Sequence, residues 1–104
     1  FAAHVRAQLD DLQDNEAWPY FDTYNLHHYE ALAAYPKLYG DHRSVSAGRP
    51  LWVTECAMPL RWTGDPKLEE LSENDLRMQS ERVAKVFCGS LHEGSAATFH
   101  FILG

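Results

Sequence analysis

Two short stretches of the sequence combine residue types that can carry out acid–base or nucleophilic chemistry. In LWVTE a single carboxylate, Glu55, follows an apolar run, and in NLHHY two imidazoles and a phenol follow one another as His27, His28 and Tyr29. A carboxylate can act as a nucleophile or as a general acid or base, and its ionisation depends on the groups that surround it. We therefore take Glu55 as the centre of a candidate site.

Other chemistries have less support in the residue spacing. Cys56 directly follows Glu55, but the glycines of a nucleophile elbow are absent and the sequence places no histidine beside it. The histidines show neither an HExxH motif nor paired ligand spacing, so we expect no metal and no other cofactor. Cys56 and Cys88 are too few for a disulfide framework, and we expect both to be reduced, buried thiols.

Length and charge limit the class of protein. A chain of 104 residues with 45% hydrophobic content makes one modest domain with a marginal core. The net charge of −6, with nine scattered Lys and Arg residues, argues against binding to nucleic acid or to an anionic membrane. No stretch approaches the roughly 18 apolar residues of a membrane span, and the first residues lack the apolar core of a signal peptide. The sequence is typical of a soluble chain, and it leaves the compartment open.

The elements that must position these side chains alternate between helical and extended patterns. Helical spacing of apolar residues, aromatic-rich segments and proline or glycine breakers set the boundaries. In the first half they predict a helix over 1–14, a strand over 21–27, a short helix over 29–39 interrupted at Pro36, a loop over 40–50 and a strand over 51–55.

The second half begins with a long connection and then contains the clearest helix of the chain, over residues 72–94. Ser72 and Asp75 fit a capping box at its start, and Gly94 fits its end. One apolar face is expected from Leu76, Val83, Phe87 and Leu91. The final apolar run, residues 97–103, predicts a third strand.

This order of elements predicts an α/β fold with three parallel strands, adjacent in sequence order, that bring Glu55 and His27 to the same end of the sheet. Three strands alone leave exposed edges, which isolated domains usually avoid. We therefore expect residues 1–104 to form a single partial domain of a longer catalytic domain. Its edges would be covered by a missing segment or by self-association.

The two reactive stretches also carry a resemblance to a known group of enzymes. A strand ending in His-x-Tyr, here His27-His28-Tyr29, and a following strand ending in WVTE resemble the C-terminal portion of a clan A retaining glycoside hydrolase. This clan includes the family 5 cellulases and mannanases and the family 39 xylosidases. The resemblance implies a partial (β/α)8 (TIM) barrel, with nearly the whole chain covering about two-fifths of the usual 250 residues.

The resemblance also implies a role for each site residue. Glu55 would be the nucleophile, Tyr29 would hydrogen-bond it, and His27 would contact the sugar beside the scissile bond. Trp62, in the loop after Glu55, would offer an apolar face to a sugar ring, or else cover the core. The family's acid/base glutamate lies on a strand that this chain starts too late to contain.

Two classes of function stay open. The first is part of a glycoside hydrolase that cleaves O-glycosidic bonds by a retaining double displacement, with carbohydrate as its substrate. The second is a non-catalytic fragment of the barrel fold that binds carbohydrate or acts as a scaffold. A glutamate at a strand end is often a solvated surface residue, and His27, His28 and Tyr29 can equally be parts of the scaffold. The sugar, the linkage and endo or exo action are left undecided.

Overall fold

The computed structural model describes residues 21–61 and 70–101, which form a three-stranded sheet and two α-helices. The elements in chain order are β1 (Tyr24–His28), the 3-10 turn η2 (Leu32–Ala34), α2 (Tyr35–Val45), β2 (Leu51–Cys56), α3 (Glu73–His92) and β3 (Ala97–His100). All strand pairs are parallel, in the order β1-β2-β3. The predicted α/β class and strand order are thus confirmed, whereas the predicted helix over 1–14 lies outside the described residues.

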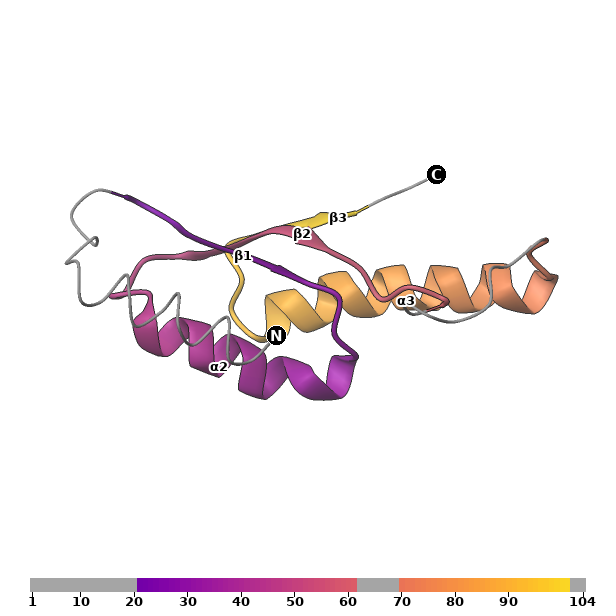
Figure 1. Ribbon diagram of the computed structural model, residues 1–104, viewed down its shortest axis with the longest axis horizontal. Helices are drawn as coiled ribbons and strands as arrows, with labels where there is room; N and C mark the ends of the chain where they lie inside the picture. Colours follow the sequence, from indigo (N-terminus) through magenta and orange to yellow (C-terminus); the bar gives the residue numbers. More distant parts are fainter. Residues whose placement is uncertain (1–20, 62–69, 102–104) are drawn as a thin grey trace.

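The two helices cover the same face of the sheet (Figure 1). Apolar side chains from both helices and from the first two strands meet there in one buried cluster: Tyr24, Leu26, Tyr35, Tyr39, Leu51, Val53, Cys56 and Val86. On the opposite face Asn25, His27, Trp52 and Phe99 are exposed. Each strand therefore has one face packed against helices and one face that no described helix covers, and we call the latter the open face.

Helix α2 differs from its prediction at both ends. Pro36 lies in the first turn of α2 rather than interrupting a helix, because a first-turn residue needs no hydrogen bond from its backbone nitrogen. The helix then continues to Val45, through residues predicted as a loop. Tyr39 and His42 are both buried along the helix. One of its buried positions is therefore occupied by a polar residue, which a search for regularly spaced apolar residues does not find.

Helix α3 begins as predicted but buries a different face. The side chain of Ser72 accepts from the backbone N–H of Asp75 in a capping box, and Gly94 adopts a positive φ of 87° just beyond the helix end. Val86 and Ser90 are the buried residues of the helix. Of the face predicted from Leu76, Val83, Phe87 and Leu91, all but the partly buried Val83 are exposed.

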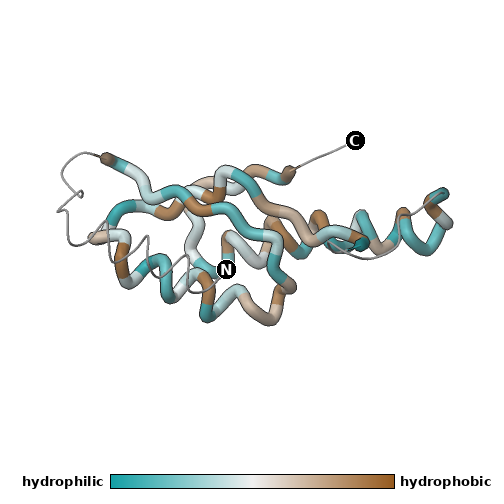
Figure 2. Tube along the Cα trace, in the orientation of Figure 1, coloured by the Kyte–Doolittle hydropathy of each residue, from teal (hydrophilic) through white to brown (hydrophobic). Residues whose placement is uncertain are grey.

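Two observations account for this difference in α3. The first half of the helix extends beyond the ends of the strands, so it has little sheet to cover (Figure 1). Hydrophobic and hydrophilic residues are also interspersed along the helix (Figure 2), so its pattern alone gives no single dominant face. Contact with α2 is made instead through the small residues Gly89 and Ser90, which let the helix approach Tyr35 and Tyr39 closely.

A buried series of hydrogen bonds links β1 to both helices. His28, only 1% exposed, hydrogen-bonds through Nε2 to the Tyr39 hydroxyl at 2.8 Å, and that hydroxyl donates to Ser90 Oγ at 2.7 Å. Since the single Tyr39 proton goes to Ser90, His28 must donate from Nε2, which leaves Nδ1 as an acceptor. Nδ1 is buried and has no partner among the described residues. Burial, and then repulsion from His42, lowers the pKa of His28 to about 4.

Two helical glycines offer a paired test of packing between α2 and α3. A Cβ added at Gly89 would lie 2.5 Å from Leu32 Cδ1 and 3.0 Å from two ring carbons of the buried Tyr35, whereas one added at Gly40 meets nothing within 4 Å. Alanine gains about 1 kcal/mol over glycine in a helix, and overpacking costs about 1 to 3 kcal/mol. We expect Gly40→Ala to raise the free energy of unfolding by about 0.5 to 1 kcal/mol. Gly89→Ala should lower it by about 1 kcal/mol.

Urea denaturation of the two variants beside the wild-type chain measures both changes. Equal stabilisation by the two alanines would show that Tyr35 does not lie against α3.

Candidate active site

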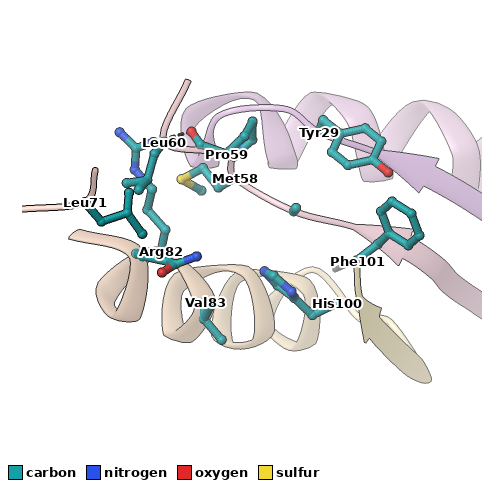
Figure 3. A pocket seen from close by; sticks show the side chains of 11 residues that line it. Tyr29, Met58, Pro59, Leu60, Leu71, Arg82, Val83, His100 and Phe101 are labelled. Carbon is teal, nitrogen blue, oxygen red and sulfur yellow. Dashed lines mark hydrogen bonds between the residues drawn. The ribbon is translucent and has the colours of Figure 1, made fainter. Parts of the chain in front are cut away.

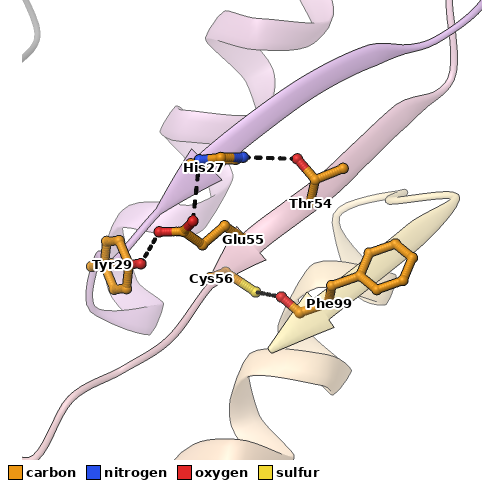
Figure 4. Close-up of polar contacts among 6 residues, drawn as sticks. All are labelled: His27, Tyr29, Thr54, Glu55, Cys56 and Phe99. Atoms are coloured by element: carbon orange, nitrogen blue, oxygen red, sulfur yellow. Dashed lines mark hydrogen bonds and ion pairs between the residues drawn. The ribbon is translucent and has the colours of Figure 1, made fainter. Parts of the chain in front are cut away.

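Glu55, His27 and Tyr29 come together at the carboxyl ends of β1 and β2 (Figure 4). Strand alternation in β1 buries His28 and turns its neighbours away from the helices, as predicted. His27 pairs with Glu55 in the parallel register of β1 and β2. The predicted common end for these side chains is therefore confirmed.

A one-residue irregularity in β2 sets the direction of Glu55. Leu51 and Val53 are buried against the helices, so strict alternation would send Glu55 to the same buried face. Instead the register shifts between Val53 and Cys56, where three steps along β2 match two along β3, and Cys56 takes the next buried position. Such a bulge re-aims a side chain, and here it keeps the carboxylate out of the apolar core.

Hydrogen bonds fix the arrangement of the cluster. The Tyr29 hydroxyl donates to Glu55 Oε1. His27 Nδ1 lies 3.7 Å from Glu55 Oε2, while His27 Nε2 lies 2.8 Å from Thr54 Oγ1. Thr54 thereby holds the imidazole from its far side and limits its rotation (Figure 4).

The phenol of Tyr29 is set up as a donor to the carboxylate. Loss of hydration, the hydrogen bond to Glu55 and the charge of Glu55 raise the pKa of Tyr29 to about 12. The hydroxyl therefore keeps its proton at neutral pH and remains a hydrogen-bond donor to the carboxylate. The Glu55 side chain is 28% exposed, so the group is partly screened but still reachable from solvent.

The cysteine beside the cluster is inert. Cys56 is fully buried, and its thiol donates to the Phe99 carbonyl oxygen at 3.4 Å. Burial raises the pKa of Cys56 to about 11, so the nucleophilic thiolate is scarce at neutral pH. The prediction of a buried thiol holds for Cys56 but is wrong for Cys88, which is exposed on α3.

The remaining predictions concern residues or ligands beyond this cluster. Trp62 lies outside the described residues. Within residues 21–61 and 70–101, no group of three or more His, Cys, Asp and Glu side chains is placed to hold a metal ion. In the same ranges, no helix is both long and apolar enough to cross a membrane.

Sequence reasoning missed one member of the cluster, Thr54. The alternating pattern gave no sign of the extra residue in β2 that brings Thr54 within reach of His27. A polar pair at the end of an otherwise apolar strand, Thr54-Glu55, is the one signal in the sequence that points to such an irregularity.

Comparison of the chain with protein-family models, with curated proteins and with solved structures gave no match. Support for a function therefore comes from the geometry around Glu55 and from the resemblance carried by the WVTE and His-x-Tyr stretches.

Proposed function

We propose that Glu55 is the catalytic nucleophile of a retaining glycoside hydrolase that cleaves O-glycosidic bonds. The observation that carries this proposal is the hydrogen bond from Tyr29 to a carboxylate at the carboxyl end of a parallel strand. Active sites of (β/α)8 barrels lie at this end of their strands. A donor that keeps its own proton holds the carboxylate in a fixed orientation for attack on a substrate.

The proposed reaction proceeds in two displacements. The Glu55 carboxylate attacks the anomeric carbon, the bond to the leaving-group oxygen breaks, and a carboxylic acid protonates that oxygen. Water then attacks the resulting glycosyl ester and is deprotonated by the same acid/base group, which releases the sugar and regenerates Glu55. His27, beside Glu55 on the open face, is placed to hydrogen-bond a sugar hydroxyl.

The proposal includes the rest of a barrel. A (β/α)8 barrel needs about 250 residues, so the three described strands supply only part of one. Trp52 and Phe99 are exposed on the open face, which would form the packed interior of a closed barrel. We propose that further strands cover this face and supply the acid/base carboxylate.

A mechanism-based fluorosugar tests the assignment directly, because it accumulates as a covalent ester on the nucleophile. The full chain, and a longer polypeptide that contains it, would be incubated with the reagent and mapped by peptide mass spectrometry. We expect the label on Glu55. Glycoside cleavage with a label on another residue would refute the assignment, and sugar binding without cleavage or label would favour the non-catalytic carbohydrate-binding alternative.

Removal of the Tyr29 hydroxyl should weaken catalysis moderately. Tyr29→Phe deletes one hydrogen bond to a charged acceptor, worth about 1.5 to 3 kcal/mol. We therefore expect kcat/KM on an aryl glycoside to fall by about ten- to hundredfold. Tyr35→Phe is the matched control, because the buried Tyr35 hydroxyl has no partner among the described residues and lies outside the cluster. Equal effects of the two changes would argue against a role for the contact between Tyr29 and Glu55.

A further inference from the structure

A pocket of about 330 Å³ opens beside the Glu55 cluster, between the residues that follow β2, the end of β3 and helix α3. Figure 3 shows apolar side chains over much of its wall, among them Met58, Val83 and Phe101, with Arg82 and His100 also lining it. Tyr29 belongs to both places, since its ring lines the pocket while its hydroxyl donates to Glu55.

Among the described residues of the pocket wall, Arg82 is the one side chain that carries a permanent charge. One guanidinium nitrogen donates to the Pro59 carbonyl oxygen, which anchors the side chain across the pocket. Within residues 21–61 and 70–101, no carboxylate lines the pocket and none forms an ion pair with Arg82. The bond to Pro59 orients the guanidinium, and its remaining N–H donors have no carboxylate partner in the described part of the chain, an arrangement that suits recognition of a carboxylate.

This positive charge stands out against the charge of the whole chain. The net charge is −6, so most of the surface repels anions. A lone guanidinium in a partly apolar wall is weakly screened, and it attracts an anion more strongly than an exposed lysine does. The pocket thus combines a mostly apolar wall with one positively charged group that can bind an anion.

A second polar group in the wall faces no protein partner. His100 stacks loosely with Phe87, with ring centroids 6.3 Å apart, and its ring makes no hydrogen bond to any residue in the described ranges. Its Nδ1 is buried, which leaves Nε2 as the nitrogen that a bound molecule can reach. Polar groups in a pocket wall without protein partners commonly find them in a ligand.

We propose that this pocket binds a small aromatic carboxylate that carries a hydroxyl at the end remote from its carboxylate. The carboxylate pairs with Arg82, the ring packs on Met58, Val83 and Phe101, and the hydroxyl hydrogen-bonds His100. A volume of about 330 Å³ suits a single-ring compound of this kind. The proposal is independent of whether Glu55 is a nucleophile.

Isothermal titration calorimetry of the full chain with para-hydroxyphenylpropanoate tests the proposal. The matched ligand is the corresponding amide, which has the same shape without the charge. We expect the carboxylate to bind at least about tenfold more tightly than the amide, with a preference that weakens as salt is added. Equal affinity for the two ligands, or no binding of the carboxylate, would overturn the proposal.

Three variants on α3 identify the group that recognises the charge. Arg82→Gln should abolish the preference for the carboxylate, and Arg82→Lys should retain part of it because the positive charge remains. Lys85→Gln removes an exposed charge from the next turn, where Lys85 pairs with Glu81, and should leave the preference unchanged. Circular dichroism verifies that each variant is folded. An unchanged preference in folded Arg82→Gln, or a loss in Lys85→Gln as large as that in Arg82→Gln, would refute the site.

The proposed hydrogen bond between the ligand hydroxyl and His100 is tested separately. His100→Phe keeps an aromatic ring but removes the hydrogen-bonding nitrogen, so it should weaken binding of the hydroxylated ligand about tenfold. Phenylpropanoate, which lacks the hydroxyl, should bind this variant and the wild type equally. Equal weakening of both ligands would place the hydroxyl elsewhere and refute the orientation proposed here.

Discussion

Replacing Glu55 by glutamine should lower the turnover of glycosides by at least about a thousandfold while leaving sugar binding largely intact. Glutamine keeps the size of the side chain and can still accept the hydrogen bond from Tyr29, but it cannot attack the anomeric carbon as an anion. The measurement is kcat and KM on aryl glycosides, in a form of the protein that cleaves them. The loss should fall on kcat, because the missing charge acts in the transition state.

Two further variants make this result specific to Glu55. Glu81→Gln makes the same chemical change at an exposed position on α3 and should leave turnover unchanged. Glu55→Ala opens space at the site, so added azide should attack the anomeric carbon from the vacant side and give a glycosyl azide of inverted configuration. Near-normal turnover in Glu55→Gln would show instead that Glu55 is a surface glutamate.

Acid should destabilise the fold strongly through His28. The pKa of His28 is lowered from 6.5 to about 4 in the folded chain, so between these values the unfolded chain binds a proton that the folded chain does not. Stability is therefore complete above about pH 6.5 and falls as the pH decreases toward 4, by about 3 kcal/mol for this group. For a domain of modest size this is a large share of the total stability.

Urea denaturation of the wild type and His28→Phe at about pH 7 and about pH 4 measures this contribution. We expect the wild type to lose about 3 kcal/mol more than the variant between the two conditions. His42, whose pKa burial also lowers, titrates in both proteins, so the effect of its own burial is common to the two. Val53→Ala serves as a control, because a core cavity costs a similar amount at both pH values. Equal losses in the wild type and His28→Phe would contradict the assignment.

The sequence predicts the sheet better than the helices. The aromatic-rich segment around Leu26 and the apolar run around Val53 separate clearly from their surroundings, and the handedness of crossovers sets their arrangement, so the parallel strands and their order can be predicted from the sequence. The helix faces do not follow, because burial in α2 involves His42 and burial in α3 involves Gly89 and Ser90. None of these three residues is hydrophobic enough to contribute to a periodic pattern of apolar residues.

Three members of the candidate site were predicted, but Thr54 and the geometry were not. Glu55 was identified from its position at a strand end, and His27 and Tyr29 from the resemblance carried by the His-x-Tyr stretch; the structure brings all three together. Their convergence depends on the bulge in β2, which arises from tertiary register and is signalled in the sequence only by the polar pair Thr54-Glu55. Strict alternation would have placed the Glu55 carboxylate in the apolar core.

The bulge in β2 also bears on which changes in chain length this strand can tolerate. Leu51, Trp52 and Val53 followed by Glu55 and Cys56 already form a regular alternating strand, so Thr54 has the position of a single inserted residue. Deleting Thr54 would keep every other side chain on its present face. Deleting Trp52 would reverse the faces of the residues on one side of the gap. Two single-residue deletions, two positions apart, thus differ in whether the apolar side chains of β2 still face the helices. Substitutions alone would not reveal this difference.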